Sequence, residues 1–177
     1  YSMGGYGTLK IAMKYPGVFS SIYAMAPCCL SPSEMTVEQL QAAQALKPED
    51  IEKAAGFALA TPATLSAWAP DPQNPPFYFA SGIKDGAVDP LLLARLHANS
   101  PIVMLPQYVT ALKGLEAISI DVGDKDFLLR DDTWMHEELT RFGIAHDWEV
   151  FDGDHGNRVN ARIRSDLLPF FGQHLDK

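Results

Sequence analysis

The sequence lacks the features that mark membrane-spanning and nucleic-acid-binding proteins. No apolar run approaches the roughly 18 residues that suggest a transmembrane helix. Basic residues are in the minority, because 14 Lys and Arg stand against 22 Asp and Glu, and the formal net charge is −8. Binding to a phosphate backbone requires a basic face, so we expect no nucleic-acid partner. The absence of a long apolar run leads us to expect no membrane span.

Cysteine and the common metal and nucleotide motifs are also scarce. The only two cysteines, Cys28 and Cys29, are adjacent, which makes a bridge between them geometrically poor and a disulfide framework unsupported. The sequence has no His-Glu-x-x-His, no paired Cys-x-x-Cys, no P-loop and no complete Gly-x-Gly-x-x-Gly. We therefore expect neither a metal nor a cofactor.

The composition and the order of apolar segments predict a globular α/β protein. Hydrophobic residues make up 47% of the 177 residues and charged residues 20%. Apolar runs that read as strands alternate with amphipathic segments that read as helices, which is typical of a parallel sheet flanked by helices. The expected strands are 21–26, 117–122 and 148–151, and the expected helices follow Ser2 and cover 91–97, 106–115, about 131–142 and 157–174.

Residues 31–76 interrupt this alternation. Segments 33–46 and 48–59 have helical patterns, whereas 61–76 is rich in proline and reads as irregular chain. We interpret 31–76 as a helical cap inserted into the α/β domain, which covers residues 1–177.

The first seven residues read Tyr-Ser-Met-Gly-Gly-Tyr-Gly and precede a helix-like run. This pattern matches what remains of a nucleophile elbow, Gly-x-Ser-x-Gly, whose first glycine would lie one residue before Tyr1. In such an elbow Ser2 is the nucleophile, and the backbone N–H of Met3 is a natural oxyanion donor at the start of the helix. The alternative is that Ser2 only caps a helix beside a glycine-rich turn.

The position of each histidine relative to the strands separates one candidate base from the others. His155 lies in a loop just after the strand that ends near residue 151, where catalytic residues of α/β sheets collect. His146 precedes that strand, while His97, His136 and His174 fall within or at the end of helices and suit surface or packing roles. We expect His155 to be the general base.

An acid is expected in the loop after the strand at 117–122. Asp121 lies within that strand, whereas Asp124 and Asp126 lie in the loop beyond it. We choose Asp126 as the carboxylate that orients His155, with Asp124 as the alternative or as a solvated turn residue. The order Ser, Asp, His along the chain is that of the α/β-hydrolases.

Three segments together resemble the Putative esterase family of α/β-hydrolases, which includes esterase D or S-formylglutathione hydrolase-like enzymes and feruloyl and acetyl esterases. The segments are 2–7 with the following helix, 121–128 and 151–159, and the resemblance covers nearly the whole chain. The resemblance implies an α/β-hydrolase fold, Ser2 as nucleophile, Asp126 as acid and His155 as base. It also implies hydrolysis of carboxylic esters.

The chain departs from the family pattern at its front. The first glycine of the elbow, the strand that leads into it, the earlier strands and the loop with the second oxyanion donor are missing from the 177 residues. An unpaired strand edge would then be exposed. We expect an upstream N-terminal segment, a companion chain or a homo-oligomer to complete the sheet.

The combined pattern predicts a serine carboxylesterase for short-chain acyl or aryl esters, acting through an acyl-enzyme. The same residues would also serve a thioesterase, an acyltransferase or a peptidase, and a non-catalytic hydrolase-like binding fragment is the alternative from another class. Trp68, Phe127 and Trp134 are candidates for the walls of a substrate pocket, although each suits a packing role as well.

Overall fold

The computed structural model describes residues 1–54 and 56–175 and divides the chain into two compact units. The first unit consists of Tyr1–Ser31 together with Pro101–Lys177, and the second is Pro32–Ser100. No helix within the described ranges is long and apolar enough to cross a membrane.

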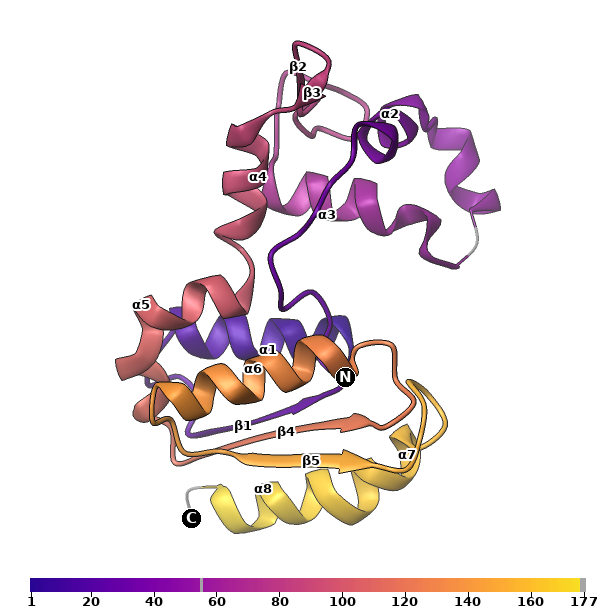
Figure 1. Ribbon diagram of the computed structural model, residues 1–177. Helices are drawn as coiled ribbons and strands as arrows, with labels where there is room; N and C mark the ends of the chain where they lie inside the picture. The colour runs from indigo at the N-terminus through magenta and orange to yellow at the C-terminus, as the bar shows by residue number, and fades with distance from the viewer. Residues whose placement is uncertain (55, 176–177) are drawn as a thin grey trace. The chain divides into compact units, whose positions relative to one another are not determined.

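A three-stranded parallel sheet forms the centre of the first unit (Figure 1). Its strands are β1 (Ser21–Met25), β4 (Ala117–Gly123) and β5 (Asp147–Phe151), in the order β1-β4-β5. Strand β4 is buried almost throughout because it lies between the other two and helices cover both of its faces. The predicted α/β class with a mostly parallel sheet is confirmed.

Helices cover both faces of this sheet (Figure 1). One face carries α1 (Met3–Lys14), α5 (Pro101–Lys113) and α6 (Leu129–Arg141). The other face carries α7 (Val159–Arg162), a π-helical turn (Ile163–Leu167) and α8 (Leu168–His174). The main core lies under the first group, and its fully buried side chains include Leu9, Met13, Leu105, Ile120, Met135 and Leu139. This burial holds the ends of β1, β4 and β5 in fixed positions.

A buried polar cluster connects the second helical layer to the sheet. Arg162 of α7 donates to Oδ2 of Asp121 on β4 at 2.7 and 2.9 Å, and the Tyr23 hydroxyl donates to the same oxygen at 2.6 Å. Burial raises the pKa of Asp121, and the hydrogen bonds from Tyr23 and Arg162 oppose that rise. Arg162 also bonds Glu149 on β5, so one guanidinium joins α7 to two strands.

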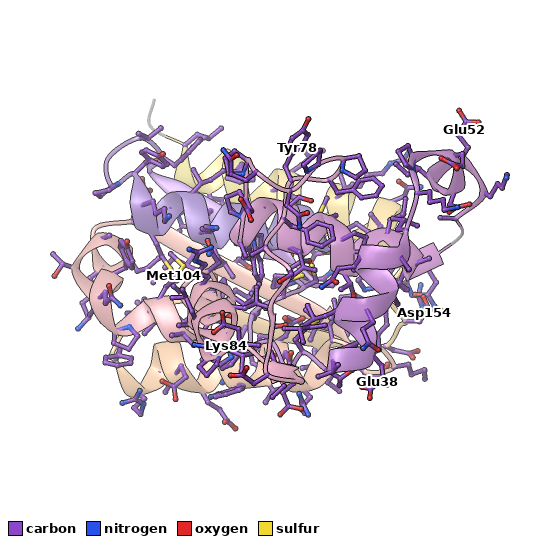
Figure 2. All side chains as sticks on the ribbon, turned by 90° about the horizontal axis from the view of Figure 1, so that it is seen from above. Glu38, Glu52, Tyr78, Lys84, Met104 and Asp154 are labelled. Carbon is purple, nitrogen blue, oxygen red and sulfur yellow. The ribbon has the colours of Figure 1, made fainter. Side chains whose placement is uncertain are left out.

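The second unit is a small helical body with one hairpin. It contains α2 (Val37–Ala45), α3 (Ala60–Trp68), α4 (Pro90–His97), the 3₁₀ helices Pro48–Lys53 and Gly56–Leu59, and the hairpin strands β2 (Ile83–Lys84) and β3 (Ala87–Val88). Its core includes Leu40, Leu65, Phe79, Leu92 and Leu96. The charged side chains labelled on this unit in Figure 2, Glu38, Glu52 and Lys84, are exposed.

Several sequence expectations for this part of the chain were wrong. Residues 61–68 are helical rather than irregular, because Pro62 lies in the first turn of α3, where a backbone N–H needs no helical acceptor. Segment 48–59 forms short 3₁₀ helices in place of one α-helix. The expected cap at 31–76 differs in extent from the compact unit Pro32–Ser100, whose core includes Leu92 and Leu96 of α4.

Helix α5 also differs from its prediction. The sequence pattern places its start at Pro106, but the helix begins at Pro101 and Pro106 lies inside it. Both prolines carry the signal of a first helical turn, and the first of the two is the one at which the helix starts. The strand and helix that flank the acid loop, β4 and α6, begin and end within about two residues of their predicted limits.

Candidate active site

Three side chains from distant parts of the sequence form one hydrogen-bonded row in the first unit. The Oγ of Ser2 lies 3.1 Å from Nε2 of His155, and Nδ1 of His155 lies 2.8 Å from Oδ2 of Asp126. A carboxylate only accepts hydrogen bonds, so in the neutral ring Nδ1 carries the proton and Nε2 accepts from the serine hydroxyl. The structure thus brings together the three residues that the sequence selects.

The backbone of Ser2 has the sharp turn that an elbow requires. Its φ of 53° and ψ of −121° are unfavourable for a residue with a side chain. Three backbone hydrogen bonds hold it there: the Ser2 N–H donates to the Met25 carbonyl at 2.9 Å, and the Ser2 carbonyl accepts from the N–H groups of Cys28 at 3.2 Å and Tyr6 at 3.1 Å. The loop that follows β1 therefore fixes the conformation of Ser2.

Gly5 lets helix α1 approach this loop. A Cβ at residue 5 would lie 2.8 Å from Cα of Pro27, which is closer than packed atoms allow, whereas Gly4 and Gly7 have open space around them. Of the three glycines in the elbow motif, only Gly5 is required by close packing. Met3 is the first residue of α1, so its N–H has no carbonyl one turn earlier and is a donor suited to an oxyanion.

Asp126 is held rigidly in the loop after β4. Its side chain is fully buried, and its Oδ1 accepts the Leu128 N–H at 2.9 Å while Oδ2 faces His155. The alternative acid, Asp124, accepts the Gly153 N–H at 2.9 Å and so closes a contact between the two loops. Asp126 is the carboxylate that meets the histidine, and Asp124 shapes the backbone nearby.

The His155 ring contacts an aromatic side chain from each of two other segments. The Phe127 ring lies 4.7 Å from it and the Tyr1 ring 4.9 Å, measured between ring centroids. The Tyr1 hydroxyl also donates to the His155 carbonyl oxygen at 2.5 Å. Sequence reasoning missed Tyr1, although its place directly before Ser2 in the elbow was a signal that its side chain lies near the site.

Burial and hydrogen bonds shift the pKa of two side chains near this group. Burial, followed by the charges of Asp126 and Asp154, raises the pKa of Tyr1, which keeps its hydroxyl protonated as a donor. Asp154 is exposed (Figure 2), and hydrogen bonds from the N–H groups of Gly156 and Asn157 lower its pKa. Asp154 therefore shapes the turn that carries His155.

A comparison with protein families finds a model described as "Putative esterase" that matches residues 1–159. The chain belongs to this esterase family. A comparison with curated proteins gave no significant match.

Solved structures show the same fold as this esterase-family chain. A structure named ferulic acid esterase has a TM-score of 0.56 and 19% identity, and the match covers 97% of this chain and 49% of that one. S-formylglutathione hydrolase of Staphylococcus aureus has a TM-score of 0.52 and 16% identity, over 99% and 49% of the two chains. Fluorophosphonate-binding serine hydrolase F of the same organism has a TM-score of 0.52 and 19% identity, over 99% and 52%. The chain thus spans about half the length of these structures.

The esterase-family chain has a second buried carboxyl group near the acid loop. Asp132 of α6 is 0% exposed, and neither of its side-chain oxygens has a hydrogen-bond partner among the described residues. Burial, and then the charges of Asp126, Asp131 and Asp121, raise the pKa of Asp132 to about 9. The group is therefore a neutral acid at pH 7, which no sequence pattern indicated.

Three of the other histidines of this esterase-family chain are engaged elsewhere. Nδ1 of His136 lies 2.8 Å from Nε2 of His146, and the His136 ring stacks on Trp148. His97 contacts the Ser33 carbonyl through Nε2 at 3.1 Å, within the second unit. None of these contacts involves Ser2 or Asp126.

The three pocket candidates have different surroundings. Phe127 contacts His155 and is 65% exposed, so its ring is available to a ligand at the site. Trp134 is 38% exposed on α6. Trp68 packs against the core of the second unit, as the packing alternative anticipates. Within the described residues no group of three or more His, Cys, Asp or Glu side chains has an arrangement that would hold a metal ion.

Proposed function

We propose that the protein is a serine carboxylesterase that hydrolyses short-chain acyl or aryl esters through Ser2, His155 and Asp126. The observation that carries the proposal is the continuous row from the serine hydroxyl through the imidazole to a buried carboxylate. Membership of the esterase family supports an ester bond as the target. The exposed Phe127 ring beside His155 offers an apolar surface to an acyl or aryl group.

The first half-reaction forms an acyl-enzyme. Ser2 Oγ attacks the ester carbonyl while Nε2 of His155 takes the hydroxyl proton, and the N–H of Met3 donates to the oxyanion. His155 then returns the proton to the leaving alcohol as the carbon–oxygen bond breaks. In the second half-reaction water attacks the acyl group by the same route and releases the acid.

Asp126 serves this cycle by its position. Its carboxylate accepts the Nδ1 proton of His155, fixes the tautomer that leaves Nε2 free, and stabilises the imidazolium formed during attack. The Leu128 N–H holds the carboxylate in place, and burial excludes water that would compete for it.

We propose further that an upstream segment of the same polypeptide completes the sheet. Strand β1 pairs only with β4 among the described residues, and a groove of about 700 Å³ lies along its other side. The groove is lined by α1, β1, α8 and the segment between α1 and β1, and its lining includes Thr8, Ile11, Val18, Phe19, Ile22 and Phe171. An apolar strand preceding Tyr1 would fill it, and the twofold greater length of the similar structures supports this occupant.

The hydrolysis of an activated aryl acetate tests the catalytic proposal. We expect a burst of phenolate equal to the enzyme concentration, and a loss of at least about a thousandfold in turnover for Ser2→Ala and for His155→Ala. A loss of only tenfold, or no burst, would contradict the assignment. Added thiols or alcohols distinguish an acyltransferase, because the acyl group then appears on the acceptor in place of free acid.

The intact mass of the natural protein and its oligomeric state test the upstream segment. A chain longer than these 177 residues, with β1 protected from amide hydrogen exchange, is the expected result. A stable dimer or a complex with a second polypeptide would instead assign the free edge of β1 to a partner chain.

A further inference from the structure

The loop after β1 carries two adjacent thiols that face each other. Cys28 and Cys29 are both free, and their Sγ atoms lie 2.6 Å apart. Cys29 is exposed and Cys28 half-buried. The φ of Cys29 is +62°, a left-handed conformation that costs a non-glycine residue about 1 kcal/mol or more. The backbone therefore holds the two sulfurs together at a surface that reagents can reach.

The two thiols differ in acidity. The hydrogen bond from the Cys28 thiol lowers the pKa of Cys29, against the opposing effects of burial and of the Asp131 charge. The same interaction, followed by burial, raises the pKa of Cys28. Because the thiolate is the reactive form of cysteine, the exposed Cys29 is the nucleophile of the pair and Cys28 is the second thiol.

The pair is also connected to the nucleophile elbow through the backbone. The Cys28 N–H donates to the Ser2 carbonyl, and two residues earlier the Ala26 N–H donates to the Asp121 carbonyl at 2.7 Å. Ala26 also has a positive φ, of 40°. A change in the torsions of the Cys28–Cys29 peptide therefore acts directly on one of the three backbone hydrogen bonds that hold Ser2 in its strained conformation.

We propose that Cys28 and Cys29 form a reversible modification site for reagents that bridge two thiols, and that bridging loosens the Ser2 elbow. The reagents belong to two chemical classes, low-molecular-weight disulfides and trivalent arsenicals. The reactivity of the site is independent of the proposed esterase activity, whereas its effect on ester hydrolysis depends on that activity.

Both reactions balance without a further reagent. With a disulfide RSSR, the Cys29 thiolate attacks one sulfur and expels RS⁻, which takes the Cys28 proton. Cys28 sulfur then attacks Sγ of Cys29 and expels the second RS⁻, which is protonated by solvent to replace the proton first lost from Cys29. The protein dithiol is oxidised and RSSR is reduced to two RSH. With an aryl arsenoxide, the two thiols form two sulfur–arsenic bonds and the oxygen leaves as water.

A bridge at this position is expected to open easily. Adjacent Cα atoms are about 3.8 Å apart across a trans peptide, closer than the roughly 4.4–6.8 Å of ordinary disulfides. A bridge between neighbours is therefore strained and readily reduced, which is the property of labile disulfides rather than structural ones.

Intact-protein mass spectrometry tests the site. One equivalent of phenylarsine oxide should add one phenylarsenic group, and oxidised glutathione should remove two hydrogens, with dithiothreitol reversing both. Cys28→Ser and Cys29→Ser are matched controls that keep one thiol each and should resist bridging. Absence of a dithiothreitol-sensitive bridge in the natural sequence, or equal modification of either variant, would overturn the proposal.

Amide hydrogen exchange tests the connection to the elbow without relying on catalysis. Bridging should increase exchange at the Cys28 amide at least about tenfold, because the bond to the Ser2 carbonyl is weakened. Unchanged exchange in the bridged protein would overturn the connection.

If the esterase proposal holds, bridging should also slow labelling of Ser2 by a fluorophosphonate several-fold, and Cys29→Ser should be labelled at the same rate with or without the reagents. Failure of labelling in the untreated protein would count against the esterase proposal alone.

Discussion

Gly123 lies so close to Gly153 that a Cβ on residue 123 would stand 2.2 Å from the Gly153 carbonyl oxygen. Gly123 ends β4 and Gly153 follows β5, so this contact joins the loop that carries Asp126 to the loop that carries His155. The Lys125 N–H, which donates to the Gly153 carbonyl at 2.9 Å, strengthens the same contact. The separation of acid and base therefore depends on the absence of a side chain at residue 123.

Gly123→Ala should separate the two loops and lower both stability and activity. Because the obstructing atoms are backbone, they cannot move aside cheaply, and we expect a loss of about 2–3 kcal/mol in the free energy of unfolding. Denaturant unfolding and ester turnover measure the two effects. The matched control is Gly156→Ala in the histidine loop, since a Cβ there meets nothing within 4 Å. If both variants behave alike, the close contact does not set the geometry.

The protein should lose stability as the pH rises, because of Asp132. Its folded pKa of about 9 lies above the reference value of about 3.9, so between these values the folded state holds a proton that the unfolded state has lost. The free energy of unfolding therefore falls with rising pH in this window, by up to about 1.4 kcal/mol per unit from this group. The fall ends above about pH 9.

Asp132→Asn removes the titrating group and should flatten this dependence. We expect the variant to gain at least about 1 kcal/mol on the natural sequence between pH 5 and pH 8.5, measured by denaturant unfolding at each pH. Glu137→Gln is the control, because Glu137 is an exposed acid of the same helix α6 and is not among the charges that shift the pKa of Asp132. Parallel curves for the natural sequence and Asp132→Asn would show that Asp132 is ionised in the folded protein.

Tyr1→Phe should lower turnover with little effect on the Michaelis constant. The variant keeps the ring against His155 but loses the hydrogen bond to the His155 carbonyl, worth about 0.5–1.5 kcal/mol. Because the imidazole of the variant is less restrained, we expect its kcat to be several-fold lower. Tyr15→Phe, at an exposed tyrosine after α1, serves as the control. An effect confined to KM would assign Tyr1 to substrate binding instead of to the position of the base.

Two conservative variants test whether Asp126 or Asp124 is the acid that orients His155. Asp126→Asn should lower turnover by about 10⁴, since the amide NH2 can donate to Nδ1 and so favours the wrong tautomer, and a neutral amide does not stabilise the imidazolium. Asp124→Asn keeps an oxygen for the Gly153 N–H and should retain most of the activity. A larger loss in Asp124→Asn than in Asp126→Asn would reverse the assignment. Steady-state kinetics on one activated ester provides the comparison.

The order of strands and loops allowed much of the site to be predicted from the sequence. Asp126 and His155 each follow a segment that reads as a strand, parallel strands bring such ends to one edge, and Ser2 was recognised from the glycine-rich turn that it opens. Asp132 was missed because it looks like an ordinary acidic residue in the first turn of a helix, and only tertiary packing buries it. Local patterns also misplaced the start of α5, since Pro101 and Pro106 carry the same local signal.

The most direct test of the account is the reaction of the purified protein with a fluorophosphonate, followed by mass spectrometry and sequencing of the modified peptide. We predict one adduct, on Ser2, which forms at least about a thousandfold more slowly in His155→Ala because the hydroxyl then lacks its base. An adduct on another residue, or none on the folded protein, would contradict the assignment of Ser2 as the nucleophile.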